Sequence, residues 1–359
     1  MKSSNFFPYI RLSLGTESPE TFTFPEGKEL RDLLKVAKAQ GLQGLLFSGL
    51  DKIDTASRGY NPKESEEYGR LIATSWQIEK VREVHIAKIA KLVSFLRNSG
   101  KRCCLLKGVG LGALYDEGTR RQPGDVDLWV EGPRDETLEF LEKKWRVQEV
   151  VYHHCDVAGL SKPNVEFHFT PSWMFDVADN RRLQNFFREH ADAQFSNMDT
   201  ALGLPVPTED FNLVFVMVHI YRHLFDEGLK IKQFVDYFYL LKHSTPEQRA
   251  AAIAFLKSIH MGKFVAGVMS VLIRSLAMPG EWALCPPDAT AGAIIESELD
   301  AFLYATTINH PGEGSFKRVS RRARHRWGLL RAFPREVLAA PFFKSWQYIW
   351  RLSNGYFAK

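Results

Sequence analysis

The chain has 359 residues, of which 45% are apolar and 25% are charged, and its net charge is +5. This composition excludes a chain that is disordered throughout, and the length predicts two domains or one domain with a large helical addition. The four cysteines include no C-x-x-C pair, so the sequence indicates neither a zinc site nor a disulfide framework. Because we find no secretory signal and no apolar run of the ~20 residues that span a bilayer, we expect a soluble, cytoplasmic protein.

Residues 1–100 are predicted to form an N-terminal helical region. Apolar side chains at helical spacing indicate helices over residues 28–40 and 42–50. A longer amphipathic helix is expected over residues 62–98, with Gly100 as its end.

The pattern of apolar residues changes over residues 101–205. Short apolar or alternating runs predict strands at 103–106, 126–130, 147–152 and 165–169. Shorter helices are predicted at 109–115 and 134–144. This segment is therefore expected to hold a small mixed β-sheet with flanking helices, which makes the fold class α+β.

Residues 206–314 are predicted to be a helical domain, so that the C-terminal half of the chain is largely helical. Its expected helices, which share an apolar period of three to four residues, are 211–225, 230–242, 246–259, 263–276 and 291–308.

Residues 315–359 form a basic, aromatic C-terminal tail with eleven Lys or Arg residues and a single acid, Glu336. Its first part, residues 315–335, predicts contact with nucleic acid or an anionic membrane surface, and such contact weakens with salt. The alternative interpretation is a solvated helix face that also pairs with the acidic body of the chain.

Three acidic residues of the predicted sheet carry the strongest chemical signal. Asp125 and Asp127 are separated by one residue on a predicted strand, so both carboxylates point to the same face. Glu166 lies on a second predicted strand. Carboxylates this close repel one another unless a cation neutralises them, and Mg²⁺ or Mn²⁺ prefers such oxygen ligands. The alternative is a turn whose acids face solvent, with Glu166 as a cross-strand partner of Lys107 or Arg121.

A wider pattern surrounds these acids: K-G, a short helix, R-x-x-G-D-h-D-h-h-V and then h-E-h-H, where h is apolar. It resembles the uncharacterised nucleotidyltransferase family of the DNA polymerase beta-like nucleotidyltransferase superfamily. The matching positions are Lys107, Gly108, Arg121, Gly124, Asp125, Asp127, Val165, Glu166 and His168 in the core, and His219, His223, Lys232 and Asp236 in the helical half. The resemblance extends over about residues 68–241.

The resemblance implies that residues 101–205 are a nucleotidyltransferase-like catalytic core. Its catalytic and metal-binding residues would be Asp125, Asp127 and Glu166, holding two Mg²⁺ or Mn²⁺ ions. The residues implied to bind the nucleotide are Lys107, Gly108, Arg121, Gly124 and Lys232. An NTP, with ATP as the expected donor, would give its nucleoside monophosphate to a hydroxyl acceptor and release pyrophosphate. The acceptor stays open among a sugar, a small metabolite, a protein and RNA.

One departure from the superfamily keeps two other functions open. The superfamily has a Gly-Ser pair whose hydroxyl bonds a phosphate, whereas this chain has Lys107 and Gly108 there. A nucleotide-binding pseudoenzyme is therefore one alternative, and an adaptor that acts through the basic tail on nucleic acid or a membrane surface is the other.

The histidines are interpreted mainly as structural. His219 and His223 are four residues apart on a predicted helix and could share a metal, but they are expected to be satisfied side chains between sheet and helices. His168 shares a strand face with Glu166 and either orients a ligand or bonds within the sheet. The pair His153 and His154 is discounted as a metal cluster because the sequence offers no further spaced ligands. A salt bridge between Lys232 and Asp236 is the alternative to a nucleotide-binding role of the lysine.

Overall fold

The computed structural model describes residues 2–54, 62–160, 162–305 and 315–357. The N-terminal region is helical as predicted. It contains α1 (Phe7–Leu14), α2 (Gly27–Gln40), α3 (Gln43–Leu50) and the long helix α4 (Glu66–Asn98). Short 3₁₀ turns lie at Ser3–Asn5, Pro19–Thr21, Pro62–Glu64 and Gly280–Trp282. The α4 helix begins after Ser65, whose hydroxyl accepts a hydrogen bond from the Tyr68 amide as an N-cap.

Within the described residues, five strands form a mixed sheet in the order β1-β2-β5-β4-β3. They are β1 (Cys103–Leu106), β2 (Val126–Val130), β3 (Val147–Val150), β4 (His154–Val157) and β5 (Val165–His168). The central pair β2 and β5 is parallel, and the other pairs are antiparallel. The predicted strand 147–152 is too long, because the chain turns after Val150 and returns as β4, a strand that the sequence analysis missed.

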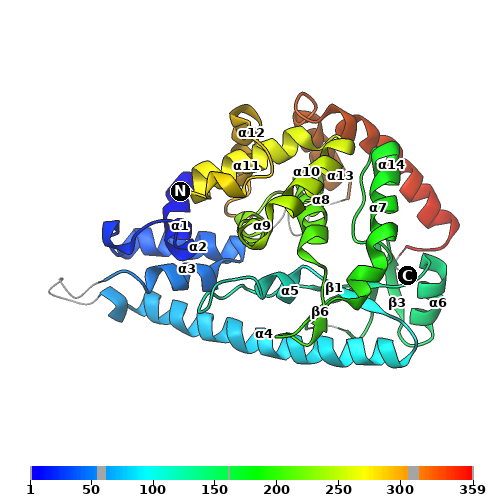
Figure 1. Cartoon of the computed structure of the whole chain (residues 1–359), viewed down its shortest axis with the longest axis horizontal. Helices are drawn as coiled ribbons and strands as arrows, with labels where there is room; N and C mark the ends of the chain where they lie inside the picture. Colours follow the sequence, from blue (N-terminus) through cyan, green and yellow to red (C-terminus); the bar gives the residue numbers. More distant parts are fainter. Residues whose placement is uncertain (1, 55–61, 161, 306–314, 358–359) are drawn as a thin grey trace.

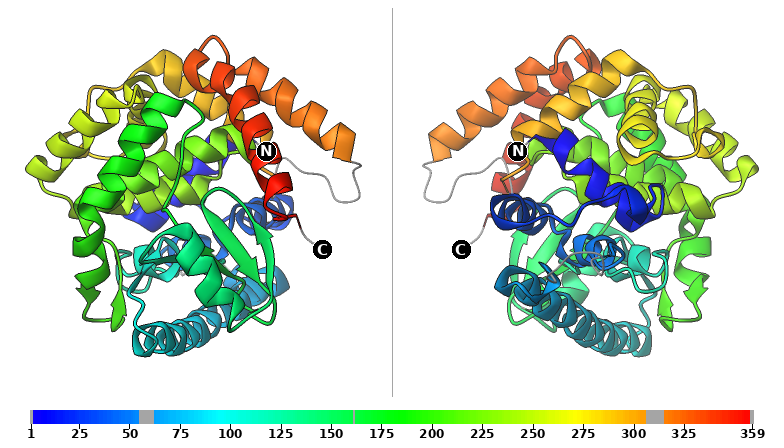
Figure 2. Two further views of the ribbon diagram at one scale, coloured as in Figure 1. Left: turned by 90° about the vertical axis from the view of Figure 1, so that its right-hand side faces the viewer. Right: turned by 90° about the vertical axis from the view of Figure 1, so that its left-hand side faces the viewer.

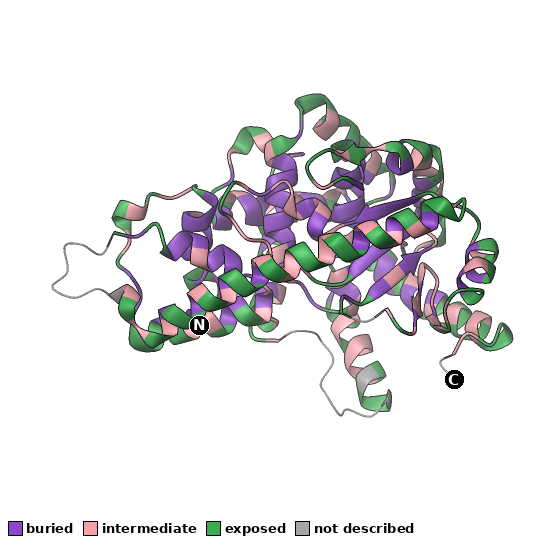
Figure 3. Ribbon diagram, turned by 90° about the horizontal axis from the view of Figure 1, so that it is seen from below, coloured by how far each residue is buried: buried purple, intermediate pink, exposed green. Residues whose placement is uncertain are grey.

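The two faces of this sheet differ in chemistry. Side chains of Leu128 and Phe167 point to one face, where they join α4 and α6 (Arg134–Glu142) in a hydrophobic cluster. In Figure 1, α4 runs along the underside of the molecule, and Figure 3 shows the outer side of this helix, which is largely exposed or half-buried. Because side chains alternate along a strand, Asp127 and Glu166 point to the opposite face, toward the C-terminal helices.

The C-terminal half is built from helices around a strongly apolar central helix, α8. The short helix α5 (Gly108–Gly112) follows β1 in the sheet segment. After the sheet, the elements up to residue 301 are α7 (Val177–Ser196), β6 (Met198–Asp199), β7 (Leu204–Pro205), α8 (Glu209–Asp226), α9 (Ile231–His243), α10 (Pro246–Ser258), α11 (Gly262–Leu276) and α12 (Ala289–Ala301). The α7 helix was not predicted. The helix expected over 291–308 ends earlier, at Ala301, and Ile308 lies outside the described residues. The predicted α+β fold is confirmed.

The described part of the basic segment 315–359 forms α13 (Ser315–Gly328) and α14 (Pro334–Ser353), which pack on the body. Figure 2 shows α14 descending from the helical half toward the sheet. Glu336 is 1% exposed and accepts hydrogen bonds from the Phe175 and Asp176 amides, and Lys344 pairs with Asp226 of α8. Several of the tail's charges therefore pair with the body, as the alternative interpretation expected.

The larger hydrophobic core includes residues of all four predicted segments, from Phe6 to Phe343. Because this core is shared by all four segments, it does not test the domain boundaries predicted at 100, 205 and 314, which stay a prediction. Among the described residues, no helix combines the length and the apolar character that a membrane span requires.

Candidate functional site

A cavity of about 370 Å³ lies between the polar face of the sheet and helices α8 and α9. All residues predicted from the sequence to act on a nucleotide or metal line it. They are Lys107, Gly108, Arg121, Gly124, Asp125, Asp127, Glu166 and Lys232. The fold thus brings together residues that are up to 125 positions apart in the chain.

The three predicted acids come from two neighbouring strands. Asp127 on β2 stands directly beside Glu166 on β5 in the parallel register, and Asp125 immediately precedes β2. Asp127 is 1% exposed, whereas Asp125 is exposed. Ligand atoms of Asp127, Glu166 and His168 all lie within 4.8 Å of one another, a spacing that could hold a metal ion.

Two cationic groups hold Asp127 in its ionised form. Lys107 Nζ lies 3.1 Å from Asp127 Oδ2, and His168 Nε2 lies 3.0 Å from Asp127 Oδ1. Burial alone would raise the pKa of Asp127, but Lys107 and His168 keep this pKa well below its usual range. The negative charge of Asp127 raises the pKa of Asp125 in turn.

His168 links the acids of the two strands. Its Nε2 also lies 3.3 Å from Glu166 Oε2. Burial opposes protonation of His168, but its hydrogen bonds to Asp127 and Glu166 outweigh burial and raise its pKa to about 9. Glu166 also lies 3.5 Å from His154, so its partners in the sheet are histidines. The alternative interpretation had expected Lys107 or Arg121 as its cross-strand partner.

The chemistry of this donor set fits a divalent cation. Two carboxylates in register and a third at the start of β2 concentrate negative charge at one edge of the cavity, and carboxylate oxygens are preferred ligands of Mg²⁺ and Mn²⁺. Lys107 and His168 compensate part of this charge at Asp127 and Glu166, and Asp125 forms no ion pair in the described residues.

The turn after β1 places Lys107 and Gly108 at the cavity wall. Both residues have a positive φ, 51° for Lys107 and 52° for Gly108, a conformation that glycine adopts without steric cost. The short helix α5 follows, slightly earlier than the predicted 109–115. A Cβ atom on Gly124 would meet nothing within 4 Å, so the cavity wall is open at that position.

Arg121 and Asp236 form a buried ion pair. Arg121 donates from Nε to Oδ1 at 2.6 Å and from Nη2 to Oδ2 at 2.8 Å, and the Tyr115 hydroxyl donates to Oδ1 at 2.7 Å. Lys232 donates to the Gln122 carbonyl oxygen at 2.6 Å. Asp236, which the alternative interpretation paired with Lys232, forms its salt bridge with Arg121 instead. Burial and the nearby Arg121 lower the pKa of Lys232 to about 7.

His219 and His223 line the cavity from α8, with ring centroids 4.5 Å apart. Burial lowers the pKa of both rings, which keeps them neutral. His223 Nδ1 lies 3.4 Å from Oε2 of Glu227, the residue that follows α8. The two histidines lie between sheet and helices as expected, but His223 is not fully satisfied, because its Nδ1 is buried without a hydrogen-bond partner among the described residues.

Several residues that line the cavity were discounted or missed in the sequence analysis. His153 and His154, which were discounted as a metal cluster, reach the cavity at the start of the unpredicted strand β4. Trp173, which was missed, reaches it through the loop after β5. Arg222 is buried, stacks over Phe175 at 3.8 Å and pairs with Asp226 and Glu336. A single arginine within the apolar run of α8 was a signal in the sequence, because an arginine is rarely buried without a partner.

Comparison with known proteins gives a family. A family model described as an uncharacterised nucleotidyltransferase matches residues 26–274, more than half of the chain. Among solved structures, an antigenic nucleotidyltransferase-like protein from Paracoccidioides brasiliensis aligns at 12% identity and a TM-score of 0.29, covering 59% of this chain and 96% of that one. A TM-score this low supports no argument about the chain. No curated protein matches the sequence significantly.

Proposed function

The chain belongs to the uncharacterised nucleotidyltransferase family, and we propose that it transfers a nucleoside monophosphate from an NTP to a hydroxyl acceptor, with release of pyrophosphate. The observation that carries this proposal is the cavity that Asp125, Asp127 and Glu166 share with three basic side chains, those of Lys107, Arg121 and Lys232. A metal-binding edge beside a cationic wall is the arrangement that a metal-bound triphosphate requires.

In this proposal Asp125, Asp127 and Glu166 hold Mg²⁺ or Mn²⁺. Bound there, the ions would stabilise the charge that develops on the attacking and leaving oxygens. Glu166, which is more accessible than Asp127, would also accept the proton of the acceptor hydroxyl. His168, hydrogen-bonded to Asp127, fixes the orientation of that carboxylate.

The nucleotide would lie on the β1 and β2 side of the cavity. Lys107 would contact the outer phosphates, and Arg121 and Lys232 would add positive charge to the wall. The open backbone at Gly108 and Gly124 would let the chain approach the phosphates closely. ATP is the first donor to test, and a sugar, a small metabolite, a protein side chain and an RNA end are the candidate acceptors.

The decisive experiment compares the protein with its Asp125→Asn/Asp127→Asn variant. Each protein is incubated with every α-labelled NTP in Mg²⁺ or Mn²⁺, together with metabolite extract, total RNA or no added acceptor. An Asp135→Asn/Asp210→Asn variant, which loses two exposed acids outside the cavity, is the matched control. We expect label transfer by the wild type and the control only.

The same experiment separates the alternatives. Metal-dependent NTP binding that needs Asp125 and Asp127, with no transfer and no pyrophosphate release, would favour the nucleotide-binding pseudoenzyme. Equal metal-dependent NTP affinity in the Asp125→Asn/Asp127→Asn variant and the wild type would contradict the assignment of these acids.

A second candidate function is binding to an anionic membrane surface through α13 and α14. The outer side of α14 exposes large apolar side chains every three or four residues, each 46% to 78% exposed: Leu338, Phe342, Trp346, Ile349 and Leu352. Lys317, Arg324 and Arg331 are exposed nearby in the sequence and would attract anionic headgroups. In this proposal the apolar part of the contact lies on α14, beyond the residues 315–335 named from the sequence.

Vesicle flotation tests this second function. We expect salt-sensitive binding to vesicles of phosphatidylserine and phosphatidylcholine, little binding to phosphatidylcholine alone, and loss of binding in Phe342→Ser/Ile349→Ser. The control Val84→Ser/Val177→Ser removes two exposed apolar side chains elsewhere. Salt-sensitive binding of RNA without binding of vesicles would favour a nucleic-acid contact instead.

A further inference from the structure

We propose that His153, His154 and His168 form a second metal site, beside the carboxylate cluster, for a transition-metal ion of the Zn²⁺ type. The three side chains lie on neighbouring strands of the sheet. His154 on β4 stands directly opposite His168 on β5, and His153 immediately precedes β4. Ion binding at these histidines is independent of the proposed nucleotidyl transfer.

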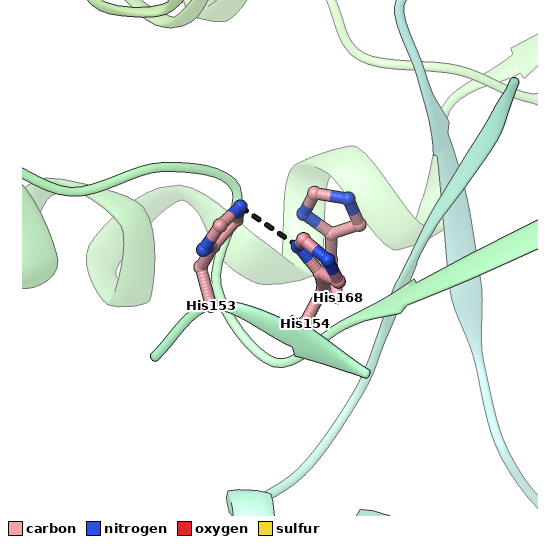
Figure 4. A group of neighbouring side chains, drawn as sticks. All are labelled: His153, His154 and His168. Carbon is pink, nitrogen blue, oxygen red and sulfur yellow. Dashed lines mark hydrogen bonds between the residues drawn. The ribbon is translucent and has the colours of Figure 1, made fainter. Parts of the chain in front are cut away.

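The ring nitrogens of the three histidines converge. His153 Nε2 lies 2.8 Å from His154 Nδ1, and one ligand atom from each of the three residues falls within a group no wider than 4.8 Å. Figure 4 shows a ring nitrogen of His168 turned toward the other two rings. Ligand atoms of a tetrahedral Zn²⁺ site, bound at ~2.0–2.1 Å, lie a little over 3 Å apart, so small rotations of the rings complete the site.

A buried nitrogen atom of His168 points to a ligand here. Within the described residues, Nδ1 of His168 is buried and has no hydrogen-bond partner. Buried polar atoms are almost always paired, so an unpaired ring nitrogen beside two other histidines calls for a bound group. His153 would bind the ion through Nε2, the nitrogen that faces His154. His168 is 2% exposed, which leaves little access for bulk water.

The surroundings of His168 match those of a metal-bound histidine. Its Nε2 is hydrogen-bonded to Asp127 and lies 3.3 Å from Glu166, while its Nδ1 is unpaired. Metal-bound histidines commonly bond a carboxylate through the ring nitrogen that does not bind the metal, and this contact fixes the tautomer and the ring orientation. His153 is held in place from another side, because its ring stacks on Trp173 with centroids 3.9 Å apart.

The donor set selects the kind of ion. Three imidazole nitrogens suit Zn²⁺, Co²⁺ or Cu²⁺, whereas Mg²⁺ prefers oxygen ligands. All three histidines line the cavity, so a fourth coordination position would open toward it, as in zinc sites that bind a substrate oxygen. On the sheet, β4 lies on the far side of β5 from β2. If the proposed function holds, this ion would contact the acceptor from the side opposite Lys107.

Titration of the chelator-treated full-length protein with Co²⁺ tests the site. The titration is done in millimolar Mg²⁺, which competes for the carboxylates. We expect one equivalent of Co²⁺ to bind under these conditions and to give the visible absorption bands of a four- or five-coordinate ion, with Zn²⁺ displacing it. His154→Asn should weaken Co²⁺ binding at least ~10-fold, the smallest effect expected when even an outer-shell partner is lost. The matched control His219→Asn/His223→Asn removes two buried histidines from α8 and should keep the bands.

Two further measurements distinguish the histidine site from the proposed nucleotidyl transfer and can refute it. The Asp125→Asn variant should retain Co²⁺ binding, so that failure of nucleotidyl transfer would leave the histidine site standing. If His154→Asn does not fold, Zn²⁺ protection of His153 and His154 from diethylpyrocarbonate in the wild type replaces it. Weak binding without a defined equivalent, equal binding by His154→Asn, or no protection by Zn²⁺ would overturn the proposal.

Discussion

The ion pair of Arg121 with Asp236 offers a quantitative test of how far the cavity wall excludes water. The side chains are 8% and 7% exposed, and two hydrogen bonds join them. Asp236→Asn keeps the shape of the side chain but removes the negative charge, which leaves a guanidinium buried without a carboxylate. Removing one partner of such a pair costs about 3–5 kcal/mol, and we expect that loss in the free energy of unfolding.

A matched ion pair provides the control. Lys242 of α9 pairs with Asp116, but these side chains are 30% and 41% exposed. Asp116→Asn should therefore cost no more than about 1 kcal/mol, as solvent-exposed pairs do. Urea unfolding followed by circular dichroism measures both losses. The double variant Arg121→Met/Asp236→Leu should recover much of the loss, because it removes both charges together.

The Asp236→Asn variant also tests the role of Arg121. If Arg121 lies beside the phosphates, NTP with Mg²⁺ should stabilise Asp236→Asn more than the wild type, because the bound anion supplies the missing negative charge. A loss below about 1 kcal/mol in Asp236→Asn, or an equal loss in Asp116→Asn, would refute the argument that the arginine is held in a medium of low dielectric constant.

Three further predictions concern single side chains. Lys107→Ala should weaken binding of NTP more than binding of the nucleoside monophosphate, measured by calorimetry, and equal losses would argue against contact with the outer phosphates. Burial lowers the pKa of Lys232 to about 7, so NTP binding at pH 8 should be accompanied by proton uptake as the lysine becomes charged, and affinity should fall as the pH rises above 7. Calorimetry in two buffers of different ionisation enthalpy measures this uptake, and its persistence in Lys232→Met would assign the proton to another group. Glu336→Ala should cost about 1–3 kcal/mol in urea unfolding for each of the two amides that lose their acceptor, and Arg222 keeps Asp226 as its partner. The half-exposed Arg335→Ala should cost at most about 1 kcal/mol. Similar losses in the two variants would contradict the docking of α14 through Glu336.

The sequence predicted the elements whose apolar pattern is strong and local. The strands at 103–106 and 126–130 match β1 and β2, and the long helix α4 begins and ends close to its expected limits. The alternation of Asp125, Val126 and Asp127 also placed both acids on one side of a strand, because side chains alternate whatever surrounds the strand. The alternation over residues 165–169 also put Glu166 on a strand, and the family resemblance implied its role; the structure sets Glu166 beside Asp127.

Elements with a mixed polar pattern escaped prediction. The β4 strand alternates polar and apolar residues from His154 to Val157, but it has only four residues, and no Gly, Pro, Asn or Asp between β3 and β4 marks the turn. The α7 helix is largely polar on its outer side, and its N-cap, Asp176, is a residue type that is equally common in turns. Their secondary structure is stabilised by the surfaces they cover, which a local pattern does not reveal.

The sequence by itself determined the chemistry available to this protein: three acids suited to a divalent cation and several cations suited to phosphate. The tertiary structure decided how these groups are paired. Arg121 meets Asp236, Lys107 meets Asp127, and His154 meets His168 because strand order and helix packing bring distant residues together. Burial then sets the strength of each pair and the pKa of each group, since the interaction of two charges depends on their distance and on the water around them. Neither quantity is encoded in the spacing of residues along the chain.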